Sequence, residues 1–253
     1  MRLWLNFLAL ALATSAKARP LTVSAPDWPP FYIHEDGNAL YRGMAWDILA
    51  NCAGQIDKDA VFDMYPIRRM FKYMETGDLD LNIMSFKAER TSTVNYGKEI
   101  VFENTYGVWS GASHTAKIKS LTDLNALNVA LLIGLHPSEE YKKWLAIRQA
   151  TPSGKETLIL NEQEQILKML ADNRIDATVG SGPEFRWRAR KLGLSTKVRD
   201  TGLLIQRQAY FFVVAKESSI YKHHPDILRR LDQCVKDMKK SGAWAKLKEH
   251  YQL

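Results

Sequence analysis

The sequence predicts a two-lobed α/β protein, in which each lobe is a mainly parallel sheet flanked by helices. Short apolar strands alternate with helical patterns in both halves of the chain, which is typical of parallel sheets. A turn, an aspartate and an apolar strand close each half, at residues 77–83 and again at 173–179. Two aromatic, β-prone segments, 106–110 and 209–215, stand where crossings between two lobes would be needed.

The first half alternates strands and helices. Helical spacing of Met44, Ile48 and Leu49 predicts a helix near the start of this half, and Pro66 and Gly77 are a typical helix start and stop. The expected strands are 21–25, 61–65 and 79–84, and the expected helices are 43–52 and 67–75. Ligands of such sheets bind at the carboxyl ends of the strands.

The second half repeats this order. We expect strands at 127–133 and 157–160 and helices at 162–172 and 136–147, the latter opened by Pro137. The helical end of the chain, 225–240 and on to 251, should fold back on the first lobe. The predicted division is therefore a discontinuous first lobe, 19–107 with 211–253, and a second lobe, 108–210.

The N-terminus has the pattern of an export signal. Arg2 precedes a short apolar run, 3–13, and the small-x-small sequence Ala16-Lys17-Ala18 follows. The run is shorter than the roughly 20 residues of a membrane-spanning helix. We therefore expect a signal peptide at 1–18, a mature chain beginning at Arg19, and a periplasmic location.

The charge balance is mildly basic. The whole chain has 35 Lys and Arg against 28 Asp and Glu. Loss of residues 1–18 removes Arg2 and Lys17 and no acid, so 33 basic residues remain and the mature net charge is about +5. The basic residues form no block, so we expect no nucleic-acid partner, and the charge suits solubility and small anions.

Ser85 and Arg90 are the first candidate ligand-binding residues. They follow an apolar strand and stand five residues apart. An arginine binds a carboxylate bidentately, and a nearby hydroxyl adds a hydrogen bond to the same oxygens. The alternative is a solvated loop, with Arg90 paired locally to Glu89 or Glu99.

The order Ser85, Glu89, Arg90, Phe102, Tyr106 resembles the carboxylate-binding segment of periplasmic solute-binding proteins of the polar amino acid type, family 3. Other matches to this family occur in the correct order along the mature chain. They are Trp28-Pro29-Pro30-Phe31, Gly43 with Asp47-Ile48, Tyr65-Pro66 with Arg68-Arg69, Gly77-Asp78-Leu79-Asp80 and Arg174-Ile175-Asp176-Ala177. The resemblance implies the two-lobe periplasmic-binding-protein fold (type II) and closure around a small solute, an amino acid or a related acid, for ABC import.

The same resemblance suggests other site residues in the first lobe. Trp28 matches the aromatic residue that covers the ligand, and its alternative role is a buried indole in the core. Tyr65 and Arg69 stand where a strand ends and a helix begins, so they are candidates to face the ligand. Their alternative is a capping or surface role.

Second-lobe candidates are His136, Ser181 and Glu184. His136 lies near an expected helix start, where free N–H groups favour an anion, although a histidine there is commonly a polar helix-starting residue. Ser181 stands where related amino-acid binders place an acid that pairs with the ligand ammonium. Glu184 is either its replacement or an ordinary carboxylate at a helix start. A zwitterionic ligand is therefore one option beside other carboxylates, peptide-like solutes and aromatic solutes.

Cys52 and Cys234 lack the spacing of a metal site. In an exported protein they are candidates for a disulfide, and the alternative is two buried thiols.

Three classes of function remain. We expect a monomeric binding protein without catalytic residues, metal or cofactor, partnered by an inner-membrane ABC permease. The alternatives are an enzyme on the same fold, a dehydratase or hydrolase of a small carboxylate with His136 or Glu184 as its acid or base, and a ligand-sensing partner of a membrane receptor.

Overall fold

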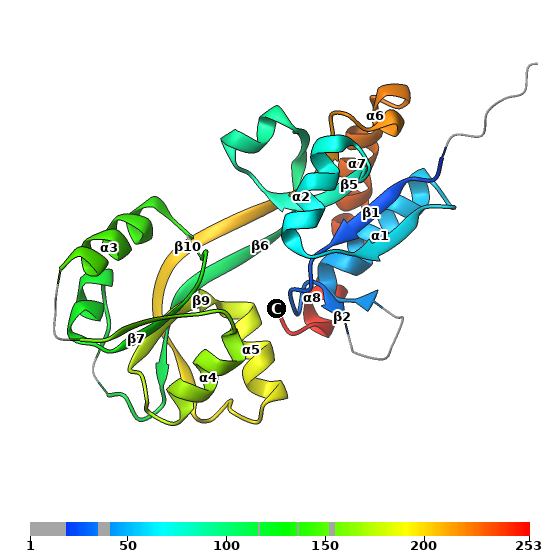
Figure 1. Cartoon of the computed structure of the whole chain (residues 1–253). Coiled ribbons are helices and arrows are strands. Elements are labelled where there is room, and N and C mark those ends of the chain that lie inside the picture. The colour runs from blue at the N-terminus through cyan, green and yellow to red at the C-terminus, as the bar shows by residue number, and fades with distance from the viewer. Residues whose placement is uncertain (1–18, 35–40, 116, 136, 152–154) are drawn as a thin grey trace, which may run out of the picture.

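The computed structural model describes residues 19–34, 41–115, 117–135, 137–151 and 155–253. They form two lobes connected by two long strands, β6 (Val94–Gly111) and β10 (Val198–Ala215), as Figure 1 shows. This confirms the predicted fold class. The expected signal peptide, 1–18, lies outside the described residues.

The first lobe combines elements from both ends of the chain (Figure 1). Its strands are β1 (Thr22–Ala25), β2 (Ile33–His34), β3 (Tyr41–Arg42), β4 (Val61–Met64) and β5 (Leu81–Ser85). Its helices are α1 (Met44–Ile56), α2 (Ile67–Thr76), the 3-10 helix η1 (Ala88–Ser92), α6 (Ser219–His223), α7 (Ile227–Lys240) and α8 (Ala243–His250). The C-terminal helices fold back on this lobe, as expected.

The second lobe is built from the middle of the chain. Its strands are β7 (Val129–Leu132), β8 (Thr157–Leu160) and β9 (Ala177–Ser181), and its helices are η2 (Leu121–Ala126), α3 (Glu139–Ala150), α4 (Gln163–Ala171) and α5 (Gly182–Lys191). Helix α3 begins later than Pro137 suggested, because Ser138 is its N-cap and accepts a hydrogen bond from the Tyr141 N–H.

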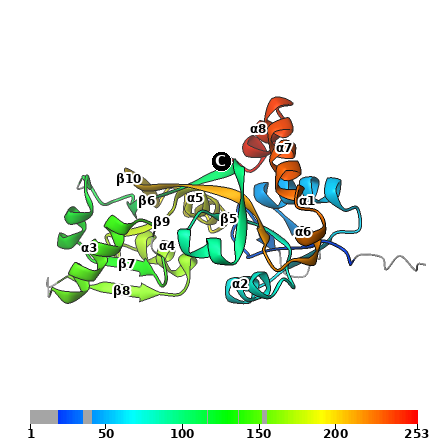
Figure 2. The same ribbon diagram turned by 90° about the horizontal axis from the view of Figure 1, so that it is seen from above.

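One sheet runs through both lobes, in the order β4-β1-β5-β10-β6-β9-β7-β8. The outer strands of each lobe are parallel, while β6 and β10 are antiparallel to each other and to their neighbours. Seen from above, these two strands run together between the lobes (Figure 2). They extend well beyond the two short aromatic segments that the sequence marks.

Each lobe has its own apolar core. In the first lobe, α1 and α7 cover the sheet with buried residues that include Ile48, Leu49 and Leu231. In the second lobe, separate clusters include Tyr141 with Val179 and Leu167 with Phe185. Each lobe therefore has the separate core that is typical of a folding unit.

Two aspartates fix the starts of parallel strands. Asp80, just before β5, accepts a 2.8 Å hydrogen bond from the Thr22 N–H, and Asp176, just before β9, accepts one of 2.8 Å from the Asn128 N–H. The sequence predicted a turn, an aspartate and a strand directed at the site. The strands end at the cleft with Ser85 and Ser181, whereas the aspartates lie at the opposite ends.

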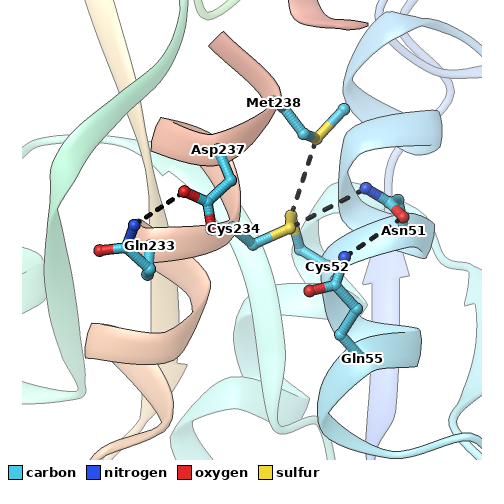
Figure 3. The surroundings of a disulfide bond; sticks show 7 residues. All are labelled: Asn51, Cys52, Gln55, Gln233, Cys234, Asp237 and Met238. Atoms are coloured by element: carbon cyan, nitrogen blue, oxygen red, sulfur yellow. Dashed lines mark hydrogen bonds between the residues drawn. A yellow bond between two sulfur atoms is a disulfide. The ribbon is translucent and has the colours of Figure 1, made fainter. Parts of the chain in front are cut away.

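A disulfide joins Cys52 of α1 to Cys234 of α7 (Figure 3). The two Cα atoms are 5.8 Å apart although 182 residues separate them in sequence. The sulfur of Met238 lies 3.9 Å from that of Cys52. The bridge therefore ties the C-terminal part of the first lobe to its N-terminal part.

No helix in the described ranges is long and apolar enough to cross a membrane. Within the same residues, no group of His, Cys, Asp and Glu side chains is arranged to hold a metal ion.

Candidate functional site

A cleft of about 910 Å³ lies between the lobes. Trp28, Tyr65, Ser85 and Arg90 line it from the first lobe, and Ser181 and Glu184 line it from the second. Six of the eight predicted ligand-binding residues thus face one cavity, whose size suits a small solute.

Backbone contacts at the start of α1 hold the loop that carries Trp28. Gly43 has a φ of 127°, and a Cβ there would lie 2.3 Å from the carbonyl oxygen of Phe31. The N–H groups of Met44 and Ala45 donate to the Pro30 and Phe31 carbonyls. Only glycine allows this close approach.

The Trp28 indole covers one side of the cleft. Its ring centroid lies 4.6 Å from that of Phe31 and 5.2 Å from that of Tyr210. Its Nε1 donates a 3.0 Å hydrogen bond to Glu184 of the opposite lobe. The indole is therefore both part of an aromatic cluster and exposed to the cleft.

Ser85 and Arg90 lie together at the carboxyl end of β5. Nη1 of Arg90 donates to the Ser85 carbonyl oxygen at 3.0 Å and contacts its hydroxyl at 3.2 Å. The Tyr96 hydroxyl donates to the same carbonyl at 3.1 Å. The Phe71 ring supports the guanidinium at 4.8 Å. These contacts fix the position of the Arg90 guanidinium and leave its other N–H groups available to a ligand.

Local ion pairing does not occupy Arg90. Glu99 pairs with Lys239, and Glu89 is exposed. Among the residues that the structure describes, none of the carboxylates forms an ion pair with Arg90. The guanidinium is half-buried beside the cleft, so an anion placed there would be poorly screened by water.

Tyr65 directly follows β4, whereas Arg69 lies on α2, and only one of the two side chains lies at the cleft. Tyr65 lines the cleft, and burial, followed by its hydrogen bond to Asp63, raises the pKa of its hydroxyl. Arg69 is exposed on α2 and is absent from the lining. The structure therefore brings Tyr65 to the site but not Arg69.

The predicted anion site at the start of α3 has less support. His136 lies outside the described residues. Leu135 lines the cleft, but the helix starts three residues beyond His136 and its Ser138 hydroxyl already caps the Tyr141 N–H.

Ser181 is the N-cap of α5 and is only 3% exposed. Its hydroxyl donates to Oδ1 of Asn104 at 2.9 Å and accepts from the Glu184 N–H at 3.4 Å. It is therefore a neutral group that is already hydrogen-bonded on both sides.

Glu184 is buried and held by three donors. Oε1 accepts from Arg188 Nε at 3.0 Å, and Oε2 accepts from Gln163 Nε2 at 2.8 Å and from Trp28. Burial raises the pKa of this carboxyl, and Arg188 opposes that shift. Arg188 also pairs with Glu164 at 3.3 Å.

Sequence reasoning missed several lining residues. Tyr106 of β6, which the sequence marked only as part of the resembling segment, and Tyr210 of β10, which was missed, share a 3.3 Å hydrogen bond between their hydroxyls, and burial raises the pKa of both. Phe71 and Gln163 were also missed. Arg188 carried a signal, since it stands four residues after Glu184 on a helix, a spacing that pairs opposite charges.

Two lobes around a cleft with a positioned arginine define a class of proteins that bind small solutes. This chain belongs to the bacterial extracellular solute-binding proteins, family 3, whose sequence profile matches residues 21–253. The family assignment agrees with the resemblance noted in the sequence.

One curated relative is similar to this chain in sequence, and solved structures are similar to it in fold. The chain is 25% identical over 225 residues to the probable amino-acid-binding protein YxeM of Bacillus subtilis (strain 168), covering 88% of this chain and 79% of YxeM. Its fold is similar to the GluR0 ligand binding core in complex with L-glutamate, with a TM-score of 0.72, 17% identity, and 93% and 99% of the two chains covered. It is also similar to a histidine kinase sensor domain resembling periplasmic binding proteins, with a TM-score of 0.70, 17% identity, and 92% and 96% covered.

Proposed function

We propose that this protein is an exported solute-binding protein that traps a small carboxylate-bearing solute, an amino acid or a related acid, between its lobes. The observation that carries the proposal is Arg90, fixed by Ser85 and Phe71, beside the cleft and without an ion-pair partner among the described carboxylates. A ligand carboxylate would complete this arrangement with bidentate hydrogen bonds.

Closure would bring the second lobe over the bound solute. We place the lobes at 19–107 with 211–253 and at 108–210, so that β6 and β10 contain the two hinges. Ser181 and Glu184 would then approach the solute from the side opposite Ser85 and Arg90. Hinged closure of this kind explains how a solute can be enclosed by residues of both lobes.

The proposed location is the periplasm, reached with the signal peptide at 1–18. The proposed partner is an inner-membrane ABC permease that receives the solute. The description of YxeM as a probable amino-acid-binding protein supports a solute of amino-acid size. We propose binding rather than catalysis, since Glu184, which is the one buried acid of the cleft in the part of the chain that the structure describes, is already held by three donors.

A sensor is the second candidate, because one similar structure is the sensor domain of a histidine kinase. Pull-down with detergent-solubilised membranes separates the two partners. Capture of permease subunits by the ligand-loaded protein supports import, and capture of a receptor kinase instead supports sensing.

The test of the binding function is calorimetry on Arg90→Ala, with amino acids and small carboxylates as ligands. Loss of the guanidinium should weaken binding of a carboxylate by about 2 to 5 kcal/mol. Arg90→Lys should restore only part, because a point charge cannot bind bidentately. Glu89→Ala, which removes an exposed neighbouring charge, is the control and should change the affinity little. Unchanged affinity in Arg90→Ala would exclude the proposed carboxylate site.

A further inference from the structure

The buried acid of the cleft is already neutralised by the protein. Glu184 is 3% exposed, and its carboxylate accepts hydrogen bonds from Trp28, Gln163 and Arg188. Arg188 also carries the counter-charge. A ligand ammonium beside Glu184 would have to displace one of these donors or lie close to the Arg188 guanidinium, which repels it.

The other polar groups of the cleft do not replace this acid. Ser181 is neutral, and its hydroxyl is hydrogen-bonded to Asn104 and to the Glu184 N–H. Glu164 shares the single Arg188 guanidinium with Glu184, so one negative charge of this group is left over, and it falls to the Glu164 carboxylate, whose side chain is 36% exposed and is screened by water. The remaining carboxylates of the lining, Asp27 and Glu162, are exposed at its edge, where water screens their attraction for a cation.

Arg90 is the opposite case. It is a half-buried cation that faces the cleft, and none of the carboxylates in the described ranges pairs with it. The buried part of the cleft therefore has one cation to be compensated, from Arg90, whereas the lining carboxylates without a counter-charge of their own, Glu164, Asp27 and Glu162, are the more exposed ones. The charges favour a ligand that is a simple anion.

Aromatic side chains form much of the surface between Arg90 and the second lobe. Phe71 lies under the guanidinium at 4.8 Å, and Trp28 and Tyr210 are 5.2 Å apart between ring centroids. One of the Tyr106 and Tyr210 hydroxyls donates to the other, which keeps its own O–H for another acceptor. Such a wall suits a planar apolar body, since aromatic rings pack against one another at these distances.

Two buried polar atoms of the lining have no hydrogen-bond partner among the described residues, the Tyr32 hydroxyl and Oε1 of Gln163. Oε1 of Gln163 is buried and accepts no hydrogen bond from the described residues, because its Nε2 is turned toward Glu184. A single ligand hydroxyl or ring N–H would satisfy it. An ammonium would gain only neutral acceptors such as these two for a full charge, which does not offset its lost hydration.

We infer that the cleft takes an aromatic monocarboxylate that carries no ammonium group and has one hydroxyl or N–H on its ring. This inference rests on the proposed binding of a carboxylate by Arg90 and narrows its ligand class. Arylpropionates are the simplest molecules with this chemistry.

The test compares each arylpropionate with the amino acid that differs from it only by the ammonium. The probes are 4-hydroxyphenylpropionate with L-tyrosine and indole-3-propionate with L-tryptophan, titrated by calorimetry into the mature chain. We expect the acid without the ammonium to bind at least about tenfold tighter in at least one pair. Equal or tighter binding of the amino acids would overturn the inference, and so would the absence of binding by all four probes.

Substitution of Ser181 gives an independent test of the charge argument. Asp and Asn are both good N-caps and have nearly the same shape, so Ser181→Asp and Ser181→Asn differ mainly by one negative charge. The Asn104 amide contacts Ser181 through Oδ1 and also interacts with the Tyr106 hydroxyl, and rotation of that amide can turn Nδ2 toward the new carboxylate. Ser181→Asp should shift the affinity ratio at least about tenfold toward the amino acid, and Ser181→Asn should not. Equal shifts in both variants would show that charge is not what selects the ligand.

The outcomes also separate this inference from the proposed function. If the amino acids bind best and Arg90→Ala abolishes their binding, the carboxylate site stands and the inference is wrong. If Arg90→Ala leaves the affinity of every bound acid unchanged, the proposed function is wrong.

Discussion

Trp28 and Glu184 join the two lobes directly, through a 3.0 Å hydrogen bond from the indole Nε1 to the carboxylate Oε2. They are 156 residues apart in the sequence, and Gln163 and Arg188 fix the acceptor from the second-lobe side. A hydrogen bond to a buried carboxylate contributes about 1.5 to 3 kcal/mol, so this contact alone stabilises the present arrangement of the two lobes measurably.

Trp28→Phe should therefore populate a more open form without ligand. The phenyl ring keeps the packing against Phe31 and Tyr210 but removes the N–H. The closed-to-open ratio should fall about tenfold or more, which spin-label distances between the lobes or the radius of gyration would report. Trp144→Phe is the control, because it removes an indole hydrogen bond to Asn125 inside the second lobe. An unchanged distance distribution in Trp28→Phe would exclude the contact as a stabiliser of closure.

The pH dependence of stability should carry the signature of Glu184. Burial raises its pKa above the ordinary value of 4.5, so the folded state binds the proton more tightly than the unfolded state. Its contribution to stability is then fully present below about pH 4.5 and is lost as the pH rises through the raised pKa. Arg188 and Glu164, which face this carboxyl, are present both in the wild type and in the Glu184→Gln variant.

Glu184→Gln removes the titration and nearly keeps the shape. The free energy of unfolding of the wild type minus that of the variant should fall as the pH rises from about 4.5 toward neutrality. Urea unfolding at a series of pH values measures this difference. A difference that grows with pH would mean that Arg188 outweighs burial.

Asp80 should be a stability residue rather than a ligand residue. It is fully buried and accepts hydrogen bonds from Arg19 at 2.7 Å, Thr22 at 2.8 Å and Ser218 at 2.6 Å. Asp80→Asn places amide hydrogens toward some of these donors, so the free energy of unfolding should fall by about 3 kcal/mol. Asp78→Asn, an exposed change in the same turn, should cost less than about 0.5 kcal/mol. Chemical denaturation measures both, and equal losses in the two variants would contradict the role given to Asp80.

The disulfide should affect stability far more than binding. It closes a loop of 182 residues behind the cleft-facing elements, and the entropy model assigns such a loop up to about 5 kcal/mol. Reduction of the wild type should lower its midpoint of denaturation and leave its ligand affinity nearly unchanged. The Cys52→Ala/Cys234→Ala double variant is the control, since reductant should not change it. A reductant-insensitive midpoint in the wild type would contradict this role.

Local patterns predicted most of the elements, because helix starts, turns and apolar strands are short-range features. Strand β8 lies where the sequence placed it, at Thr157–Leu160, and Gly77 ends α2 in the left-handed conformation. The lengths of β6 and β10 were underestimated, because only their buried aromatic stretches stand out. Their other residues, such as Leu204 with 52% exposure, are held by pairing with the partner strand rather than by burial.

The candidate site was predictable from the sequence where its residues lie close together in one segment, as Ser85 and Arg90 do. The environment of Glu184 was not, because Trp28 and Gln163 reach it from distant parts of the chain. Arg69, which was expected to face the ligand, is absent from the lining of the cleft for a local reason. It lies on the exposed side of α2, and on that helix Met70 and Met74 are the buried residues.

The pairing of β6 with β10 limits how the lobes can move. Their ladder begins at Val198 opposite Gly111 and ends at Ala215 opposite Val94, so the two connections behave as one ribbon rather than as two independent tethers. A ribbon bends across its face but resists sliding of one strand along the other, because sliding breaks the hydrogen bonds between them. Register shifts on either side of the stretch from Gln206 to Tyr210 interrupt the ladder and provide the places where it can bend. In the proposed closure, the cleft would open along nearly a single degree of freedom, and the rims of the two lobes would return to the same alignment each time.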